Sequence, residues 1–146
     1  MKLGYKIIIF IFIIVGLITY FRSGQKSKEL RFKKKVEKIV TDIRHRDYFS
    51  FQQELLPQLT KSVSIESIKK FMEPLKIERS AKIELRAIED RNNSHHISGE
   101  IDSKKIKIPF EINFVEDSNR TLFLISSQIG NSTLKGEGSV FPLRTQ

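Results

Sequence analysis

The chain contains no cysteine and no tryptophan. Without cysteine it cannot form a disulfide, a thiolate nucleophile, a cysteine-ligated zinc site or an acylated N-terminal anchor. It also lacks a glycine-rich phosphate loop, a paired-glycine dinucleotide motif and a nucleophile elbow. These absences exclude the enzyme classes that a short motif identifies. We therefore expect no catalytic residue set, no cofactor and no metal site.

What the chain does have is an uncharged apolar run over residues 7–21. Extending this run back to Leu3, with the ammonium of Lys6 reaching the headgroups, gives a helix of about 28 Å, close to the hydrocarbon thickness of roughly 30 Å. Tyr5 and Tyr20 stand where interfacial aromatic residues are expected. We predict a transmembrane anchor over residues 1–22, with the lipid bilayer as its partner.

A cleaved secretory signal is the alternative to an anchor, because a basic start followed by an apolar stretch is typical of both. Signal cleavage needs small residues after the apolar run. Residues 19–24 read Thr-Tyr-Phe-Arg-Ser-Gly, with bulky and charged side chains at these positions. We therefore predict an uncleaved signal anchor and a single-pass membrane protein.

Basic residues flank the anchor unequally. Lys2 and Lys6 precede the apolar run, and a larger basic group follows it. That group consists of Arg22, Lys26, Lys28, Arg31, Lys33, Lys34, Lys35 and Lys38. The rule that basic flanks stay inside would keep the rest of the chain in the cytoplasm. We nevertheless expect an extracytoplasmic domain, because of the family resemblance given below.

The net charge of +9 is concentrated near the anchor. Residues 22–46 carry +7, whereas residues 47–146 hold fourteen basic and fourteen acidic residues. A nucleic-acid-binding domain spreads cations over a folded face, so we do not expect a nucleic-acid partner. The basic segment is either attracted to anionic headgroups or is an ordinary solvated helix face. A weaker alternative makes it a nucleic-acid contact.

Helical periodicity follows the anchor. Apolar residues recur on one helix face at Phe32, Val36, Ile39, Val40 and Ile43, and Gly24 offers a joint before this helix. Two shorter helices follow: the first is capped by Asp47 and disrupted by Pro57, and the second is capped by Ser64 and closed by Pro74.

After Pro74 the period changes to two, which predicts strands. We expect four of them, at about residues 82–89, 96–102, 106–114 and 121–129. Pro109 cannot donate to a ladder, so it should lie at a bulge or where its strand overhangs a neighbour. The prediction is an α+β fold over residues 23–129, with about three helices on one face of a curved four-stranded antiparallel sheet, followed by a polar C-terminal tail over residues 130–146.

The order of these elements resembles the nuclear-transport-factor-2-like superfamily, also called cystatin-like, over residues 26–129. The passage Asp47-Tyr48-Phe49, followed by a short helix and then Leu55-Leu56-Pro57-Gln58-Leu59-Thr60, is similar to one that many members show. The resemblance implies a cone of helices and curved sheet. Membrane-anchored bacterial members include envelope proteins and inner-membrane components of secretion or conjugation machines, usually with the domain outside the inner membrane.

Enzymatic members of that superfamily carry an Asp, Tyr or His inside the cone, and no such set can be matched here. Aromatic and sulfur side chains could instead line the cone as a small ligand pocket, with a packed core as the ordinary explanation. The candidates are Tyr48, Phe51, Phe71, Met72, Phe110 and Phe114.

Two further groups of polar residues lie on the second predicted strand. Adjacent His95 and His96 should point to opposite faces, which disfavours a shared metal ion. His96, Glu100 and Asp102 share one face and form the best acid–base set in the chain, although solvated pairing of Glu100 with Lys107 explains them more simply.

The sequence therefore predicts a non-enzymatic binding or scaffolding module with a protein partner, held at the membrane within an envelope assembly. A small-ligand carrier or an enzyme that uses the cone interior is the alternative.

Overall fold

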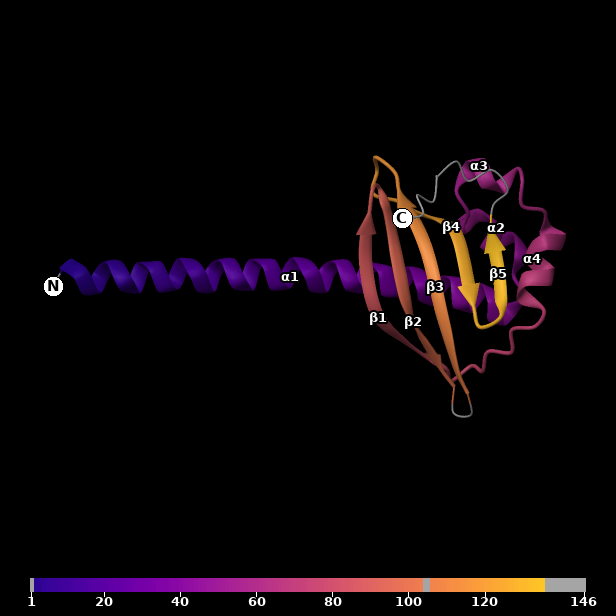
Figure 1. Ribbon diagram of the computed structural model, residues 1–146, viewed down its shortest axis with the longest axis horizontal. Helices are drawn as coiled ribbons and strands as arrows, with labels where there is room; N and C mark the ends of the chain where they lie inside the picture. The colour runs from indigo at the N-terminus through magenta and orange to yellow at the C-terminus, as the bar shows by residue number, and fades with distance from the viewer. Residues whose placement is uncertain (1, 104–105, 136–146) are drawn as a thin grey trace, which may run out of the picture. The chain divides into compact units, whose positions relative to one another are not determined.

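The computed structural model describes residues 2–103 and 106–135 of the chain. The chain divides into two compact units, Met1–Lys34 and Lys35–Gln146, and each is described here by itself. One element, the helix α1 (Lys2–His45), begins in the first unit and ends in the second (Figure 1).

Helix α1 is uninterrupted over 44 residues, so the predicted joint at Gly24 is wrong. A Cβ atom at Gly24 would meet nothing within 4 Å, so no tertiary contact forces a bend there. A glycine inside a helix costs only about 1 kcal/mol relative to alanine. That cost is too small to stop a helix whose neighbouring residues all favour it. The predicted anchor and the predicted amphipathic helix are therefore one element.

Three short helices follow in the second unit. Helix α2 (Tyr48–Glu54) is capped by Asp47, whose carboxylate accepts the backbone N–H of Ser50 at 3.0 Å. Helix α4 (Ile65–Met72) is capped by Ser64, which accepts the N–H of Ser67 at 3.1 Å. Both caps confirm the sequence prediction. Between them lies the one-turn helix α3 (Pro57–Thr60), which was not predicted: Pro57 ends α2 as expected, but it also begins α3.

The sheet has five antiparallel strands in the order β1-β2-β3-β4-β5. They are β1 (Lys82–Arg91), β2 (Ser94–Asp102), β3 (Lys107–Glu116), β4 (Leu122–Ile129) and β5 (Ser132–Lys135). Bulges between Leu85 and Ala87 and between Asn113 and Phe114 interrupt the ladder. Pro109 lies one residue beyond the last β3–β4 pair, Phe110 with Ile129, which confirms that β3 overhangs its neighbour there.

Strand β5 corrects the prediction of four strands and a polar tail over residues 130–146. Gly130, with φ of +55°, and Asn131 turn the chain tightly, and Ser132 and Leu134 then face the core. The glycine provides the left-handed conformation that a two-residue hairpin turn requires. Residues 136–146, the remainder of the predicted tail, lie outside the described part of the chain.

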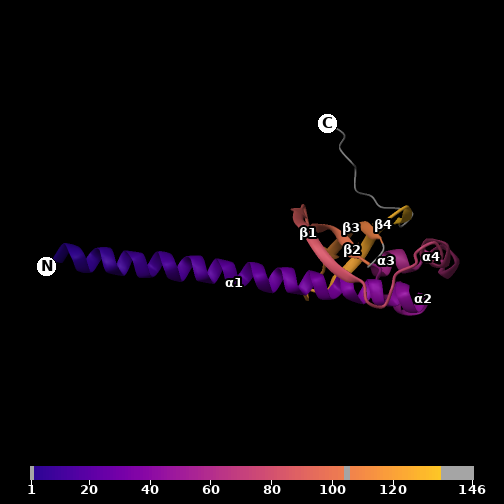
Figure 2. The same cartoon turned by 90° about the horizontal axis from the view of Figure 1, so that it is seen from below.

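The second unit has two layers, and its core lies between them. Figures 1 and 2 show the C-terminal part of α1 crossing one face of the sheet, with the short helices near β4 and β5. From α1 the core receives Val36, Ile39, Val40 and Ile43, which are at most 1% exposed. Phe110, Ile112 and Phe114 come from β3, at most 2% exposed.

The edge of β4 is closed by two different segments. Strand β5 pairs with residues 126–129 only. Over the first half of β4, Leu55 forms a parallel bridge with Leu124, and the N–H of Leu56 donates to the carbonyl of Leu124 at 2.9 Å. The extended linker between α2 and α3 thus satisfies backbone groups that β5 leaves open.

Gly99 provides a sharp test of this packing. A Cβ atom there would lie 2.2 Å from the backbone oxygen of Glu84 and 2.6 Å from Cζ of Phe110. We expect Gly99→Ala to lower the free energy of unfolding by about 1–3 kcal/mol, because the sheet must shift to admit the methyl group. Thermal unfolding of the full chain in detergent, followed by circular dichroism, measures this. Gly24→Ala is the control and should be neutral or stabilising. Equal melting temperatures for the two variants would contradict the described register of β1 and β2.

Candidate functional site

The N-terminal half of α1 leaves its apolar side chains uncovered. From Ile9 to Phe21 the large apolar residues are 40–76% exposed, so none of them is buried. Thr19 donates its hydroxyl to the carbonyls of Val15 and Gly16, at 3.0 and 2.9 Å, so this polar group is satisfied within the helix. Within the described part of the chain, one helix, near the N-terminus, is therefore long and apolar enough to span a membrane.

The predicted membrane-surface cations do not form one uniform group. Arg22, Lys26 and Lys34 are exposed on α1, and Lys28, Arg31 and Lys33 are half-buried. Lys35 and Lys38 lie in the second unit, where both form ion pairs with Glu54, and Lys38 also pairs with Asp42. Those two lysines are paired within the second unit, and of the predicted group Arg22 and Lys26 are the exposed cations nearest the apolar run.

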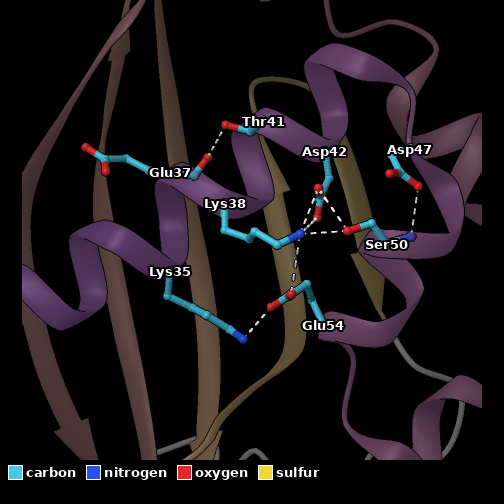
Figure 3. A network of polar contacts seen from close by, with 8 residues as sticks. All are labelled: Lys35, Glu37, Lys38, Thr41, Asp42, Asp47, Ser50 and Glu54. Atoms are coloured by element: carbon cyan, nitrogen blue, oxygen red, sulfur yellow. Dashed lines mark hydrogen bonds and ion pairs between the residues drawn. The ribbon is translucent and has the colours of Figure 1, made fainter.

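A polar network joins the end of α1 to α2, and its centre is Asp42, which is only 5% exposed (Figure 3). Lys38 donates to both carboxylate oxygens of Asp42 at 3.0 Å, and the Ser50 hydroxyl donates to one of them at 3.1 Å. Glu54 extends the network, with Lys38 Nζ at 3.8 Å and Lys35 on its other oxygen. The sequence did not reveal this network, because its members come together only when α1 and α2 pack.

Ser50 and Lys38 have the distance of a Ser–Lys catalytic pair, with Lys38 Nζ 2.6 Å from Ser50 Oγ. A lysine acts as a base toward serine only when its pKa is lowered. Here the hydrogen bond to Asp42 raises the pKa of Lys38 above its ordinary 10.5, and the charges of Asp42 and Glu54 add to this effect against the opposing influence of burial. Lys38 is therefore protonated at neutral pH and cannot take the serine proton. This network fixes two helices rather than activating a nucleophile.

On the face of the sheet away from α1, two members of the predicted acid–base set, His96 and Glu100, have different partners. His96 Nδ1 lies 2.9 Å from Asn113 Oδ1, and Asn113 donates to Ser126 at 2.9 Å, so a polar chain crosses β2, β3 and β4. Glu100 instead pairs with Arg86 at 2.5 Å and with Lys107 at 3.9 Å. The expected pairing with Lys107 is thus present, and Arg86 is a closer partner that the sequence did not suggest.

His95 points away from His96, as the strand periodicity predicted. Its Nδ1 is 2.6 Å from Asp90 and its Nε2 is 3.5 Å from Glu116. Within residues 2–103 and 106–135, no group of three or more His, Cys, Asp or Glu side chains is arranged to hold a metal ion.

The six predicted pocket residues lie in two places. Tyr48, Phe51, Phe71 and Met72 belong to α2 and α4, where the rings of Phe51 and Phe71 are 5.7 Å apart. Phe110 and Phe114 lie on β3. Five of the six are at most 3% exposed, and Tyr48 is half-buried beneath the ammonium of Lys69. A ligand pocket among them stays a prediction.

A cleft of about 290 Å³ opens elsewhere in the second unit, beside the turn from β2 to β3. It is lined by Lys76, Ile77, Glu78, Ser103, Ile106 and Ile108. None of these residues was predicted to line a pocket, since the lining comes from segments that are far apart in the sequence.

No protein-family model matches the chain, and no curated protein or solved structure is significantly similar to it. The resemblance to the nuclear-transport-factor-2-like superfamily therefore stays a prediction that rests on element order. The α+β class itself is that of the structure.

The polar network predicts a pH-dependent contribution of Lys38 to stability. Lys38→Met would leave the buried carboxylate of Asp42 with Ser50 alone, at a cost of about 1–3 kcal/mol in the free energy of unfolding near neutral pH. Since the folded-state pKa of Lys38 is raised, this contribution is fully present below pH 10.5 and is lost as the pH rises beyond that value.

Urea unfolding of the full chain in detergent, at several pH values from 7 upward, measures the effect. Lys61→Met is the matched control, since Lys61 is exposed just after α3. If both variants lose the same stability at pH 7, the network does not hold α1 to α2.

Proposed function

We propose that this chain is a single-pass membrane protein whose second compact unit is a non-enzymatic binding or scaffolding module of a bacterial envelope assembly. The observation that carries the proposal is the uncovered apolar half of α1, which is continuous with the helix that enters the folded unit. An uncovered apolar surface of this length needs a partner, and a lipid bilayer is the environment that suits a single helix.

An uncleaved anchor fits the local structure better than a removed signal. The helix continues through Phe21, Arg22 and Gly24, the region where a signal would be cut, and the residues there are not the small ones that cleavage needs. The extracytoplasmic placement of the second unit rests on the family resemblance, against the count of basic flanking residues.

A binding role is favoured over catalysis by how the polar groups of the second unit are used. Lys38 is held protonated by Asp42, Glu100 is paired with Arg86, and His96 is engaged with Asn113. A structural partner accounts for the position of each of these groups without a catalytic role. The alternative of a ligand carrier or an enzyme would need an open interior, and the close packing of Phe51, Phe110 and Phe114 does not favour it.

The charge distribution supports a protein partner for the second unit and a lipid partner for the basic segment. Residues 47–146 carry no net charge, so nothing draws this region to nucleic acid or to anionic headgroups as a whole. Exposed Arg22 and Lys26 directly follow the apolar run. Each cation near an anionic surface contributes on the order of 1 kcal/mol of attraction.

The anchor is tested by charging the middle of the span. Phe12→Lys combined with Ile13→Lys should remove the protein from the carbonate-resistant membrane fraction, because each lysine at the centre of the span costs about 2.5–3.5 kcal/mol. Leu30→Lys is the control, since Leu30 is 54% exposed beyond the span and should tolerate the charge. Native protein that begins after Phe21 and is recovered in the aqueous fraction would contradict the anchor.

The binding role is tested by isolating the intact full chain from its own membranes after cross-linking in living cells. We expect a specific protein to be recovered in a fixed ratio. A control chain carries the same residues 1–34 followed by an unrelated folded domain, and it should lose that protein. Recovery of the same proteins with both chains, or of none with intact native protein, would count against the proposal.

A further inference from the structure

Three of the five asparagines in the chain begin an Asn-x-Ser/Thr triplet: Asn92, Asn119 and Asn131. Serine and threonine together occupy about one position in seven, so fewer than one such triplet is expected among five asparagines. This triplet is the acceptor for N-linked oligosaccharides in proteins that cross a membrane. The chain therefore has more of these triplets than its composition predicts.

Two of the three triplets have an acidic residue two positions before the asparagine. Asp90 precedes Asn92 in Asp-Arg-Asn-Asn-Ser, and Asp117 precedes Asn119 in Asp-Ser-Asn-Arg-Thr. Asn131 instead has Ile129 at that position. The bacterial form of N-linked transfer requires this acidic residue, whereas the general form does not. The chain therefore carries two acceptors of the restrictive kind and one that lacks the acidic residue.

The fold places both acidic triplets in exposed hairpin turns. Asn92 lies in the turn between β1 and β2, and Asn119 lies in the turn between β3 and β4. In an antiparallel meander these two turns are at the same end of the sheet, and the turn with Asn131 is at the other end (Figure 1). All three asparagines are exposed. Among the described residues, no hydrogen bond engages the side-chain amides of Asn92 and Asn119.

We infer that Asn92 and Asn119 are acceptor sites for an N-linked oligosaccharide, and that Asn131 is not. The inference rests on the proposed extracytoplasmic placement of the second unit. In the transfer, Nδ2 of asparagine forms a bond to C1 of the first sugar, and the bond from C1 to the pyrophosphate of a polyprenyl-pyrophosphate-linked oligosaccharide breaks. One proton leaves Nδ2, and polyprenyl pyrophosphate is the leaving group.

The acidic residues also have a structural role, which is the competing explanation for their presence. Asp117 Oδ1 accepts the N–H groups of Asn119 and Thr121 at 2.9 and 2.7 Å and so holds the β3–β4 turn. An asparagine at position 117 keeps this acceptor oxygen but removes the charge. Asp117→Asn therefore separates the two roles: the turn is retained, whereas acid-dependent transfer is lost.

The experiment uses the full chain in a bacterial host that contains an acid-requiring oligosaccharyltransferase and its lipid-linked oligosaccharide. Intact mass of the purified protein should show two glycan increments. Thr121→Ala and Asp117→Asn should each remove one increment, and Ser94→Ala should remove the other. Asn131→Gln, the matched control, should leave both. Two increments that persist in Asp117→Asn, or a glycan on Asn131 alone, would overturn the inference.

A topology measurement on the same cells separates this inference from the proposed function. The chain has no cysteine, so Ser80→Cys, at an exposed position before β1, introduces a single thiol. Labelling of this thiol by a membrane-impermeant maleimide in cells whose outer barrier is opened indicates an extracytoplasmic second unit. Labelled protein without a glycan would overturn the acceptor sites and leave the proposed placement standing. Unlabelled protein would overturn the placement, and the inference with it.

Discussion

Helix α1 has to satisfy two different environments with one continuous backbone, and the rest of the structure depends on this requirement. Residues 9–21 present apolar side chains all around the helix, and none of the described residues covers them. Residues 36–43 instead concentrate their apolar side chains on one stripe, which the second unit buries completely. A helix that is apolar on all sides suits lipid, whereas an amphipathic one suits a protein core in water. The change of pattern along α1 therefore marks where a helix surface that suits lipid gives way to one that suits a protein core.

A buried carboxylate, that of Asp42, lies near the end of α1. Asp42 is nearly inaccessible, and a carboxylate in that position is tolerated only if its partners are complete. Lys38 supplies the opposite charge from the same helix, and Ser50 supplies a hydroxyl from α2. Arg46, with φ of 57°, then turns the chain and donates to the carbonyls of Met72 and Leu75 at the end of α4. Successive polar contacts thus connect α1 to α2 and to α4, which fixes the corner in one geometry.

The sequence predicted those parts of the fold that local patterns specify. Alternation identified the first four strands, since residues such as Ile108 to Phe114 leave only one face for a core. Asp47 and Ser64 identified two helix starts, because a capping side chain acts within three residues of itself. The elements that the sequence did not predict are those whose formation depends on tertiary contacts. Strand β5 has four residues and forms only because the Gly130–Asn131 turn returns it to β4. Helix α3 is a single turn after Pro57, too short for any periodicity.

In the candidate sites too, the sequence predicted what local patterns specify and missed what tertiary contacts determine. The sequence could place His96, Glu100 and Asp102 on one face, but it could not show that Arg86, the unpaired residue at the bulge in β1, reaches Glu100. It could name eight basic residues after the anchor, but not that Lys35 and Lys38 are taken up by acidic partners in the second unit. Side-chain pairing across elements depends on register and packing, which one sequence does not encode locally.

The separation of charge along the chain bears on how such a protein could work at a membrane. If the basic residues were spread over the second unit, its surface would be drawn to anionic headgroups at about 1 kcal/mol per cation. Lipid would then compete with a protein partner for the same surface. Instead most of the excess positive charge lies in residues 22–46, and residues 47–146 carry equal numbers of basic and acidic residues. In the proposed membrane-anchored arrangement, attraction to lipid is thereby confined to residues 22–46. For the proposed binding module, a folded unit without net charge leaves the choice of partner to specific contacts rather than to a general attraction to anionic lipid.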